Sequence, residues 1–394
     1  MDQGPGRARG RALQRQARGV PVGPRRHHRG GDRAVTARIE AGWGERGFVE
    51  AGASLTAYQR AGRAGAPVAI LLHGSPESAD ALAAIAKRLA RRFDVIGLDT
   101  PGNGLSAPLT APDPESADYA RHLHAFMDVM RVERAALYGF HTGAGTAMSF
   151  ALSFPERASA LALDGYAVWT KQERADFLAH YLVTYAPAWD GSHLASIWAR
   201  LEEQRLFFPW YDRRIAARMA LPVPPLELRL RRLRDWLTAG DGYLAPYRAA
   251  IRRQGEIGPD RVEVPTLIGA MEKDPLAAHL GRLGAVSPAV TIERWSEREA
   301  ALDRLAGFLF EHPGEPARGL PQPAQPPAFA ERPEDLPWQP DGHGGFLLQI
   351  WQALRQDAVA RAVDDADLAA RLDPERLHAQ LVAQVAAHTG LGQA

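Results

Sequence analysis

His141 is the residue whose position in this sequence most clearly suggests chemistry. It lies in the segment Leu137-Tyr138-Gly139-Phe140-His141-Thr142-Gly143-Ala144-Gly145, where an apolar run meets closely spaced small residues. Small residues at this spacing allow a strand to turn sharply into a helix, and the middle residue is held strained and exposed above the sheet. An imidazole there titrates near neutral pH, so it could serve as a base, an acid or a transient nucleophile.

A turn with the pattern Gly-x-Ser-x-Gly normally presents a serine nucleophile at its tip. His141 stands at the place of that serine, so the pattern predicts a fold more firmly than a reaction. Thr142 is a weaker alternative nucleophile, because the small residues around it fall at the wrong spacing, with Phe140 and Ala144 flanking it.

Alternating apolar runs and helical patterns surround this turn. Short apolar runs of this kind predict buried parallel strands, and the intervening segments repeat apolar residues at helical spacing. Strands alternating with helices predict an α/β protein with a mostly parallel sheet flanked by helices. The expected strands are residues 68–72, 94–98, 160–164, 264–270 and 289–295, together with the apolar run from Leu137 that leads into the turn at His141. The expected helices are residues 80–91, 119–132, 143–154 and 300–310.

Four motifs along residues 47–311 together resemble the α/β-hydrolase superfamily. They are His73-Gly74, Asp99-x-Pro101-Gly102-x-Gly104-x-Ser106, the turn at His141, and Asp274-Pro275-Leu276. The resemblance implies an α/β-hydrolase-like core with a helical cap inserted over the active site. It also implies that the backbone N–H groups of Ser75 and Thr142 form an oxyanion hole, and that Asp274 is the acid that orients a catalytic histidine.

The family's catalytic histidine is expected in the loop after the last strand, at residues 296–299. No histidine occurs between His279 and His312, so both the serine and the histidine of the usual triad are missing. A hydroxyl is a weak nucleophile until a positioned base takes its proton. Four explanations stay open: His141 itself does the work, Thr142 serves as the nucleophile, His193 of the cap contributes, or the protein kept a pocket and lost the chemistry.

The predicted cap, residues 171–255, is rich in aromatic side chains. Aromatics at helical spacing build a hydrophobic core whether or not a ligand is near. As a group they also favour an apolar substrate. The predicted function is therefore an enzyme with an atypical site that acts on a carbonyl or ester-like, apolar small molecule, and a retained oxyanion hole leaves lyase or isomerase chemistry open. The alternative is a catalytically inactive ligand-binding or interaction protein.

The composition limits the other possibilities. The 394 residues are 46% hydrophobic and 24% charged, as in a globular protein, and no apolar run approaches the ~18 residues of a membrane span. The absence of cysteine excludes disulfides and thiolate catalysis. No nucleotide-binding or zinc-binding motif occurs, so we expect no cofactor and no metal. We expect a cytoplasmic protein with a small-molecule substrate and no membrane partner. A homodimer that packs through the C-terminal helices is one open alternative for its assembly.

The two ends of the chain differ from the core. Residues 1–46 form an arginine-rich arm, with nine arginines and two aspartates in residues 1–34. Such an arm could bind nucleic acid or anionic lipid, but it has no aromatic interleaving or helical periodicity, so we favour an extension without that role. Residues 312–340 predict a proline-rich linker. Residues 341–394 predict helices that partly repeat the cap, since Asp341-Gly342-His343 resembles Asp190-Gly191-Ser192-His193.

Overall fold

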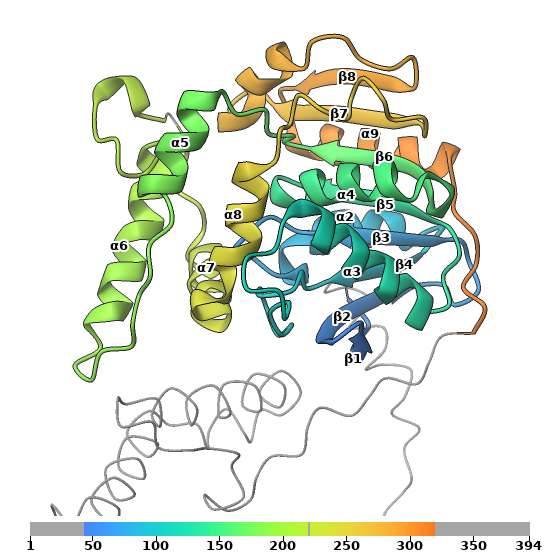
Figure 1. Cartoon of the computed structure of the whole chain (residues 1–394), viewed down its shortest axis with the longest axis horizontal. Helices are drawn as coiled ribbons and strands as arrows, with labels where there is room; N and C mark the ends of the chain where they lie inside the picture. The colour runs from blue at the N-terminus through green and yellow to red at the C-terminus, as the bar shows by residue number, and fades with distance from the viewer. Residues whose placement is uncertain (1–42, 220, 320–394) are drawn as a thin grey trace, which may run out of the picture.

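A computed structural model describes residues 43–219 and 221–319 of the chain (Figure 1). The predictions for the N-terminal arm, for most of the linker and for the C-terminal helices lie outside these residues. One eight-stranded sheet organises the described part, with the strand order β1-β2-β4-β3-β5-β6-β7-β8. Strand β2 is antiparallel to both β1 and β4, and the other neighbours are parallel. The strands are β1 (Glu45–Ala51), β2 (Ser54–Gly62), β3 (Val68–Leu72), β4 (Asp94–Leu98), β5 (Ala135–Phe140), β6 (Ala158–Asp164), β7 (Thr266–Met271) and β8 (Val290–Trp295).

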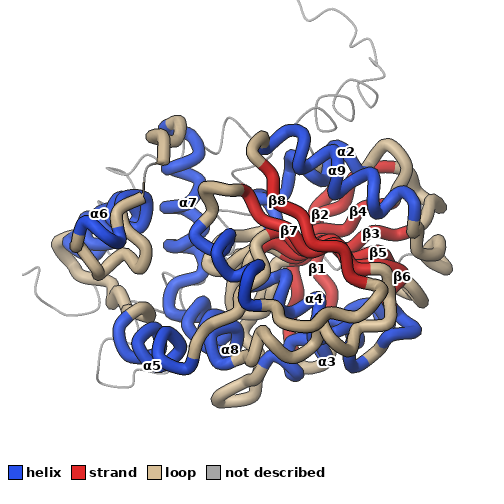
Figure 2. Tube along the Cα trace, turned by 90° about the horizontal axis from the view of Figure 1, so that it is seen from above, coloured by secondary structure: helices blue, strands red, loops and turns tan. Residues whose placement is uncertain are grey.

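Helices cover both faces of the sheet, which explains why its central strands are apolar on both sides. Helices α3 (Ser116–Val129) and α4 (Thr142–Ser153) lie on one face, and α2 (Ala83–Leu89) and α9 (Arg298–Glu311) lie on the other (Figure 2). Short 3-10 helices complete the loops: η1 (Ala79–Leu82), η2 (Pro155–Arg157) and η5 (Pro275–Arg282). The predicted α/β architecture is confirmed.

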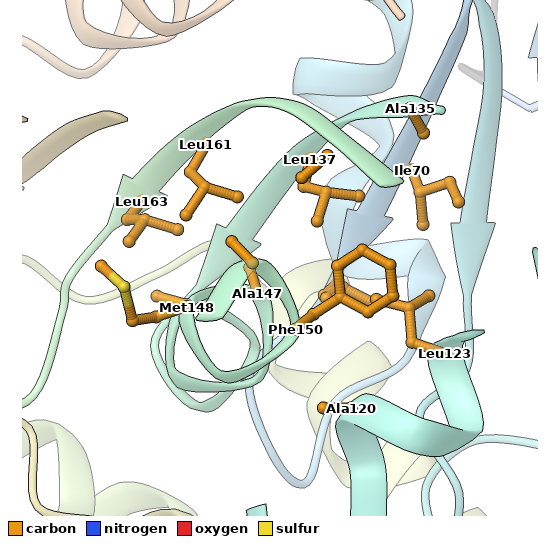
Figure 3. Close-up of a cluster of buried hydrophobic side chains, with 14 of the residues drawn as sticks. Ile70, Ala120, Leu123, Ala135, Leu137, Ala147, Met148, Phe150, Leu161 and Leu163 are labelled. Atoms are coloured by element: carbon orange, nitrogen blue, oxygen red, sulfur yellow. The ribbon is translucent and has the colours of Figure 1, made fainter. Parts of the chain in front are cut away.

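Helix α4 lies unusually close to the sheet at its N-terminal end. A Cβ atom on Gly143 would lie 2.2 Å from the carbonyl oxygen of Leu72, and one on Gly139 would lie 2.6 Å from the Cα of Ala144. Further along, Phe150 and Ala147 of α4 meet Leu137 and neighbouring strand side chains in a buried core (Figure 3). Glycines at the first turn and larger apolar residues behind it therefore fix where α4 begins, next to the ends of β3 and β5.

A helical insertion separates β6 from β7 and extends from Lys171 to Arg252. It lies beside one end of the sheet (Figure 1). Its aromatic side chains form two hydrophobic clusters of their own, one around Phe177 and Tyr181 and one around Trp236 and Tyr243. The insertion consists of α5 (Lys171–His180), α6 (Ser192–Leu206), η3 (Ile215–Ala217), α7 (Leu226–Ala239), η4 (Gly240–Tyr243) and α8 (Leu244–Arg252).

The packed region extends beyond the predicted boundaries at residues 47 and 311. On the N-terminal side, the buried indole of Trp43 lies against Gly97. On the C-terminal side, Val68 N–H donates to the carbonyl of Glu315 at 2.9 Å, and Glu315 N–H donates to the carbonyl of Arg134 at 2.8 Å. The first residues of the predicted linker are thus part of the α/β unit. Within residues 43–219 and 221–319, no helix is both long and apolar enough to cross a bilayer.

Candidate functional site

His141 occupies the tight turn between β5 and α4. Its backbone has φ 48° and ψ −108°, a conformation that L-residues seldom adopt and that costs on the order of 1–3 kcal/mol. Backbone hydrogen bonds on both sides of the residue hold this conformation. Its N–H donates to the carbonyl of Asp164 at 2.9 Å, and its carbonyl accepts from Ala144 N–H at 3.0 Å and Gly145 N–H at 3.3 Å. The predicted strand-to-helix turn is therefore present, with the histidine at its tip.

The His141 side chain pairs with Asp274, which follows β7. The distance between His141 Nε2 and Asp274 Oδ2 is 2.8 Å, and Asp274 Oδ1 accepts from Leu276 N–H at 2.8 Å. Gly165, with φ 78°, leaves the space for the imidazole: a Cβ atom there would lie 2.3 Å from His141 Cδ2. Phe140 stacks on the same ring, with centroids 3.9 Å apart. The structure thus brings together the two side chains that the sequence analysis singled out from segments 133 residues apart.

Each member of the pair shifts the pKa of the other in the direction that favours its charged form. Burial alone would lower the pKa of His141, but the carboxylate of Asp274 outweighs it, and the pKa of His141 is raised. Burial alone would raise the pKa of Asp274, but the charge and hydrogen bond of His141 outweigh it, and the pKa of Asp274 is lowered. An ionised Asp274 favours the tautomer with hydrogen on Nε2, which leaves the Nδ1 lone pair of a neutral His141 available.

Ser75 and Thr142 lie against each other beside the histidine. The Ser75 N–H donates to Thr142 Oγ1 at 2.7 Å, and the two hydroxyl oxygens are 3.3 Å apart. Thr142 N–H is in the first turn of α4, where backbone donors have no intrahelical acceptor. The two predicted anion donors are therefore neighbours, but the Thr142 hydroxyl already occupies the Ser75 amide, an arrangement that sequence spacing gave no sign of.

The other two motifs build the loops behind these donors. His73 Nε2 accepts from Thr100 N–H at 3.0 Å, which ties the loop after β3 to the loop after β4. Asp99 Oδ1 accepts from Ala79 N–H at 2.8 Å, and its Oδ2 accepts from Leu105 N–H at 2.9 Å. Burial lowers the pKa of His73, so it is a neutral scaffold residue and does not face the cavity.

A cavity of about 410 Å³ lies between this site and the helical insertion. His141, Thr142, Ser75 and Asp274 form its floor. Aromatic side chains, mostly from the insertion, form much of its wall. Its wall includes Trp169, Phe177, Tyr181, Phe208, Trp236 and Tyr247, together with the charged side chains of Glu77, Arg205, Arg232 and Arg253.

His193 is not brought to this floor. It lines a different cavity, of about 360 Å³, between the loop at Gly102 and the insertion helices, and its Nδ1 accepts from Ala188 N–H at 3.1 Å. Trp236 lies in the wall of both cavities. The structure therefore gives His193 a local role at the start of α6 and places no contact between it and His141.

Arg298 occupies the segment where the family's histidine was expected. Its Nη1 donates to Asp164 Oδ2 at 2.5 Å, and Tyr138 hydroxyl donates to the same oxygen at 2.9 Å. Asp164 is 1% exposed, and its carbonyl is the acceptor that holds the turn at His141. Sequence analysis did not identify this group, although a charged residue at the end of an apolar strand needs a buried partner and is a usable signal.

In the described part of the chain, no three histidine or carboxylate side chains are grouped as metal ligands.

Comparison with known proteins defines the family. The alpha/beta hydrolase fold model matches residues 67–283, more than half of the chain. The chain belongs to the alpha/beta hydrolase fold family. The match includes the loops of Ser75 and Asp99, the turn at His141 and Asp274.

Curated relatives of this alpha/beta hydrolase fold protein match over short stretches. An uncharacterized protein of Mycobacterium tuberculosis is 36% identical over 108 residues, which are 27% of this chain and 31% of that protein. A 2-hydroxy-6-oxononadienedioate/2-hydroxy-6-oxononatrienedioate hydrolase of Paraburkholderia phymatum is 34% identical over 121 residues, which are 30% of this chain and 42% of that protein. The chain thus matches well under half the length of these relatives.

Solved structures agree on the fold of this alpha/beta hydrolase fold protein. Epoxide hydrolase A of Mycobacterium thermoresistibile has a TM-score of 0.53 at 19% identity and covers 69% of this chain and 99% of its own. The enol-lactonase of Burkholderia xenovorans has a TM-score of 0.51 at 16% identity and covers 67% of this chain and 99% of its own. Similarity at this level concerns the fold of the chain.

Proposed function

We propose that this protein is a hydrolase of carbonyl-containing, apolar small molecules, in which the His141–Asp274 pair activates water. The 2.8 Å contact between these side chains at the floor of an aromatic-walled cavity is the observation that carries the proposal. In the proposal, His141 replaces the serine of the nucleophile elbow, and the helical insertion is the cap. A water molecule takes the part that the serine hydroxyl plays in the usual triad.

In the proposed reaction, neutral His141 accepts a proton from water at Nδ1 while Asp274 holds the opposite nitrogen. The resulting hydroxide attacks the substrate carbonyl carbon and forms a tetrahedral oxyanion. The imidazolium then returns its proton to the departing group as the bond to the carbonyl carbon breaks. Asp274 stabilises the transient positive charge without itself taking the proton.

The oxyanion is proposed to bind the backbone N–H groups of Thr142 and Ser75. In the free protein the Thr142 hydroxyl oxygen occupies the Ser75 donor, so it stands where the substrate oxyanion would stand. A rotation about the Cα–Cβ bond of Thr142 would release this donor when substrate binds. The start of α4 adds further positive potential at the same place.

The names of the curated relatives support hydrolysis of a carbonyl compound. Those with an assigned activity include hydrolases whose printed substrate carries an oxo group, from Paraburkholderia phymatum and Pseudomonas putida. The family match and the shared fold favour a reaction of the same broad class in this chain.

The test uses a panel of 4-nitrophenyl esters of straight-chain acids together with a serine-directed fluorophosphonate probe. We expect wild-type turnover, a loss of at least about 100-fold in His141→Ala, and no recovery in His141→Ser. The described residues that line the cavity include no second histidine that could take the proton of that hydroxyl. We also expect no probe labelling of the wild type. Labelling of a serine in the wild type, or full activity in His141→Ala, would contradict the proposed roles.

A catalytically inactive binding protein is the second candidate. The hydrogen bond between the Ser75 amide and Thr142 Oγ1 favours it, because that bond closes one of the two anion donors. Thr142→Val removes the competing hydroxyl while keeping the side-chain shape. Turnover in the wild type contradicts this candidate, and ligand binding without turnover in either protein supports it.

A further inference from the structure

Three arginine side chains line the cavity above His141: Arg205, Arg232 and Arg253. Two of them are neutralised by neighbouring acids. Arg205 pairs with Glu202 at 3.3 Å, and Arg232 pairs with Glu77 at 3.1 Å. A positive charge at the wall of an apolar cavity is costly unless it has such a partner.

Arg253 is different, because it forms no ion pair with any carboxylate of residues 43–219 or 221–319. Its guanidinium lies over the ring of Tyr166, with Cζ 4.6 Å from the ring centroid. A ring face stabilises the charge from one side, and the Tyr166 hydroxyl also interacts with the guanidinium. Most of the five guanidinium N–H donors still have no acceptor among residues 43–219 and 221–319. The side chain is half-buried, so part of it remains open to the cavity.

The position of Arg253 relates it directly to the reacting groups. Its Nε atom lies 3.0 Å from the place that a Cβ atom on Gly145 would take. Gly145 is in the first turn of α4, one turn beyond His141, and its N–H donates to the His141 carbonyl. The guanidinium therefore lies beside the N-terminal end of α4, where the helix dipole adds positive potential of the same sign.

The acids of the cavity cannot neutralise this charge, because both are already engaged. Burial would raise the pKa of Glu77, but Arg232 and Arg231 outweigh it and keep that carboxyl ionised and paired. Asp274 pairs with His141. What the cavity lacks is an anion that can accept two hydrogen bonds from a guanidinium, and a carboxylate fits that geometry.

We propose that Arg253 binds a carboxylate of the substrate, so that the protein selects apolar carbonyl compounds that carry a carboxylate near the reacting carbonyl group. The inference rests on the proposed function for the reaction, but its binding part does not depend on turnover. In the complex, the carboxylate lies at Arg253, the apolar body lies along the wall of Trp169 and Phe208, and the carbonyl lies at His141 and Thr142.

Binding of matched ligands tests the proposal. The probes are 6-phenylhexanoate and the neutral 6-phenylhexanamide, measured by isothermal titration at constant ionic strength. We expect the wild type to bind the carboxylate at least tenfold more tightly than the amide, roughly the effect of one charge-assisted pair. Arg253→Met should abolish this preference by weakening carboxylate binding alone. Arg253→Lys should keep part of it, since the charge remains.

Two controls separate charge recognition from general damage. Unchanged amide affinity in Arg253→Met shows that the cavity is intact. Arg261→Gln removes one positive charge at an exposed side chain outside the cavity wall, and it should leave the preference unchanged. Equal affinity of the wild type for the two probes, or a preference that survives in Arg253→Met, would overturn the proposal.

His141→Ala distinguishes this proposal from the proposed function. If His141→Ala loses ester turnover and keeps the preference for the carboxylate, both proposals hold. If no variant turns over esters and the Arg253-dependent preference is present, hydrolysis is wrong and the carboxylate site stands. If turnover depends on His141 and the carboxylate has no advantage, the reaction stands and the substrate class proposed here is wrong.

Discussion

The proposed site pairs the residue at the strand-to-helix turn directly with the acid. The histidine is at the strand-to-helix turn and contacts the acid directly, with Nε2 and Oδ2 2.8 Å apart. In the usual triad, a histidine from a later loop lies between the serine and the acid. In the proposed mechanism, His141 takes both the place of the serine and the place of that histidine, so its Nδ1 is the ring nitrogen proposed to act on water.

Asp274→Asn tests the electrostatic role of the acid. The carboxylate raises the pKa of His141, so removing its charge should lower that pKa. If neutral His141 is the base, activity rises with pH through its pKa. The rising limb of the pH–rate profile should therefore move to lower pH in Asp274→Asn, and kcat should fall by about 100- to 10,000-fold. A limb that stays in place would show that another group is titrating.

The turn pattern singled out His141, and the resemblance to the α/β-hydrolase superfamily singled out Asp274. Each follows a predicted strand, and parallel strands bring their carboxyl ends to one edge of a sheet. The sequence could not show that they touch, since it does not state which ring nitrogen or which rotamer faces the acid. The hydrogen bond from Ser75 N–H to Thr142 Oγ1 and the space left by Gly165 were also not predictable. Both depend on contacts of a few tenths of an ångström between loops.

At the level of elements, the site depends on how closely β5, β6 and α4 approach each other. Gly165 follows β6 with φ 78° and faces the imidazole edge of His141. The turn at His141 is in turn held by the carbonyl of Asp164, the last residue of β6. The end of one strand thus positions both the backbone and the side chain of the histidine at the end of its neighbour.

Gly165→Ala should therefore lower activity by more than the accompanying loss of folding stability can account for. The added methyl would lie 2.3 Å from His141 Cδ2 and displace the ring from Asp274, for which we expect a loss in kcat/KM of about 100-fold. Gly52→Ala is the matched control, since Gly52 also has positive φ (61°) and has nothing within 4 Å of its Cβ position. Urea unfolding should show about 1–2 kcal/mol of backbone strain in the control, with unchanged activity. Equal activity in the two variants would contradict this role of Gly165.

The ion pair of Arg298 and Asp164 joins the start of α9 to the end of β6. Asp164 is almost fully buried, and its Oδ2 accepts from both Arg298 and Tyr138. Arg298→Gln should destabilise the fold by about 2–4 kcal/mol, because a buried carboxylate would lose its cation. In Arg298→Gln/Asp164→Asn much of this loss should return, as measured by urea unfolding. No recovery in the double variant would mean that the arginine acts through its packing.

The interior strands were the most predictable elements. Residues 68–72 and 94–98 agree with β3 and β4 at both ends, because a strand buried on both faces is a continuous apolar run. Strands β1 and β2 were missed. They lie at the antiparallel edge of the sheet, and their sequences mix polar with apolar residues, so neither strand contains a continuous apolar run. Helix α3 begins at Ser116, earlier than predicted, because polar residues form its first turn with a capping box at Glu115.

At the level of the whole molecule, a cluster of charges holds the helical insertion against the α/β core. Arg231 and Arg232 of α7 contact Glu77, and Arg234 donates to Asp80 Oδ2 at 2.6 Å. At the centre lies Asp235, which is 3% exposed and accepts from Ser78 Oγ at 3.1 Å. Buried and partly buried pairs of this kind are screened by salt much less than exposed ones.

Asp235 should make the stability of the protein depend on pH. Burial raises the pKa of Asp235 to about 7, well above the value near 4 in an unfolded chain. An acid with a raised pKa in the folded state stabilises that state below pH ~4, and this stabilisation is lost as the pH rises to about 7. Urea unfolding at pH 5 and pH 8 should show a fall of about 2–4 kcal/mol from this group in the wild type.

Asp235→Asn provides the comparison, because an amide keeps the shape of the neutral acid and does not titrate. Its stability should fall less between pH 5 and pH 8 than that of the wild type. Asp190→Asn, at an exposed position of the same insertion, should follow the wild type. If all three proteins share one pH dependence, Asp235 does not titrate in this range.

The loop after β3 has a consequence for how such a protein would handle its ligand. Six consecutive residues, 75–80, include the Ser75 amide at the cavity floor and the side chains of Glu77, Ser78 and Asp80. These three side chains form a hydrogen bond and ion pairs with residues of α7. A movement of α7 that opens the cavity to a ligand would break these contacts with the loop. The Ser75 amide, in the same loop, would then be displaced. In the proposed mechanism, the open protein would therefore lack an aligned oxyanion donor at Ser75. The donor would return to its place only when α7 closed again over a bound ligand.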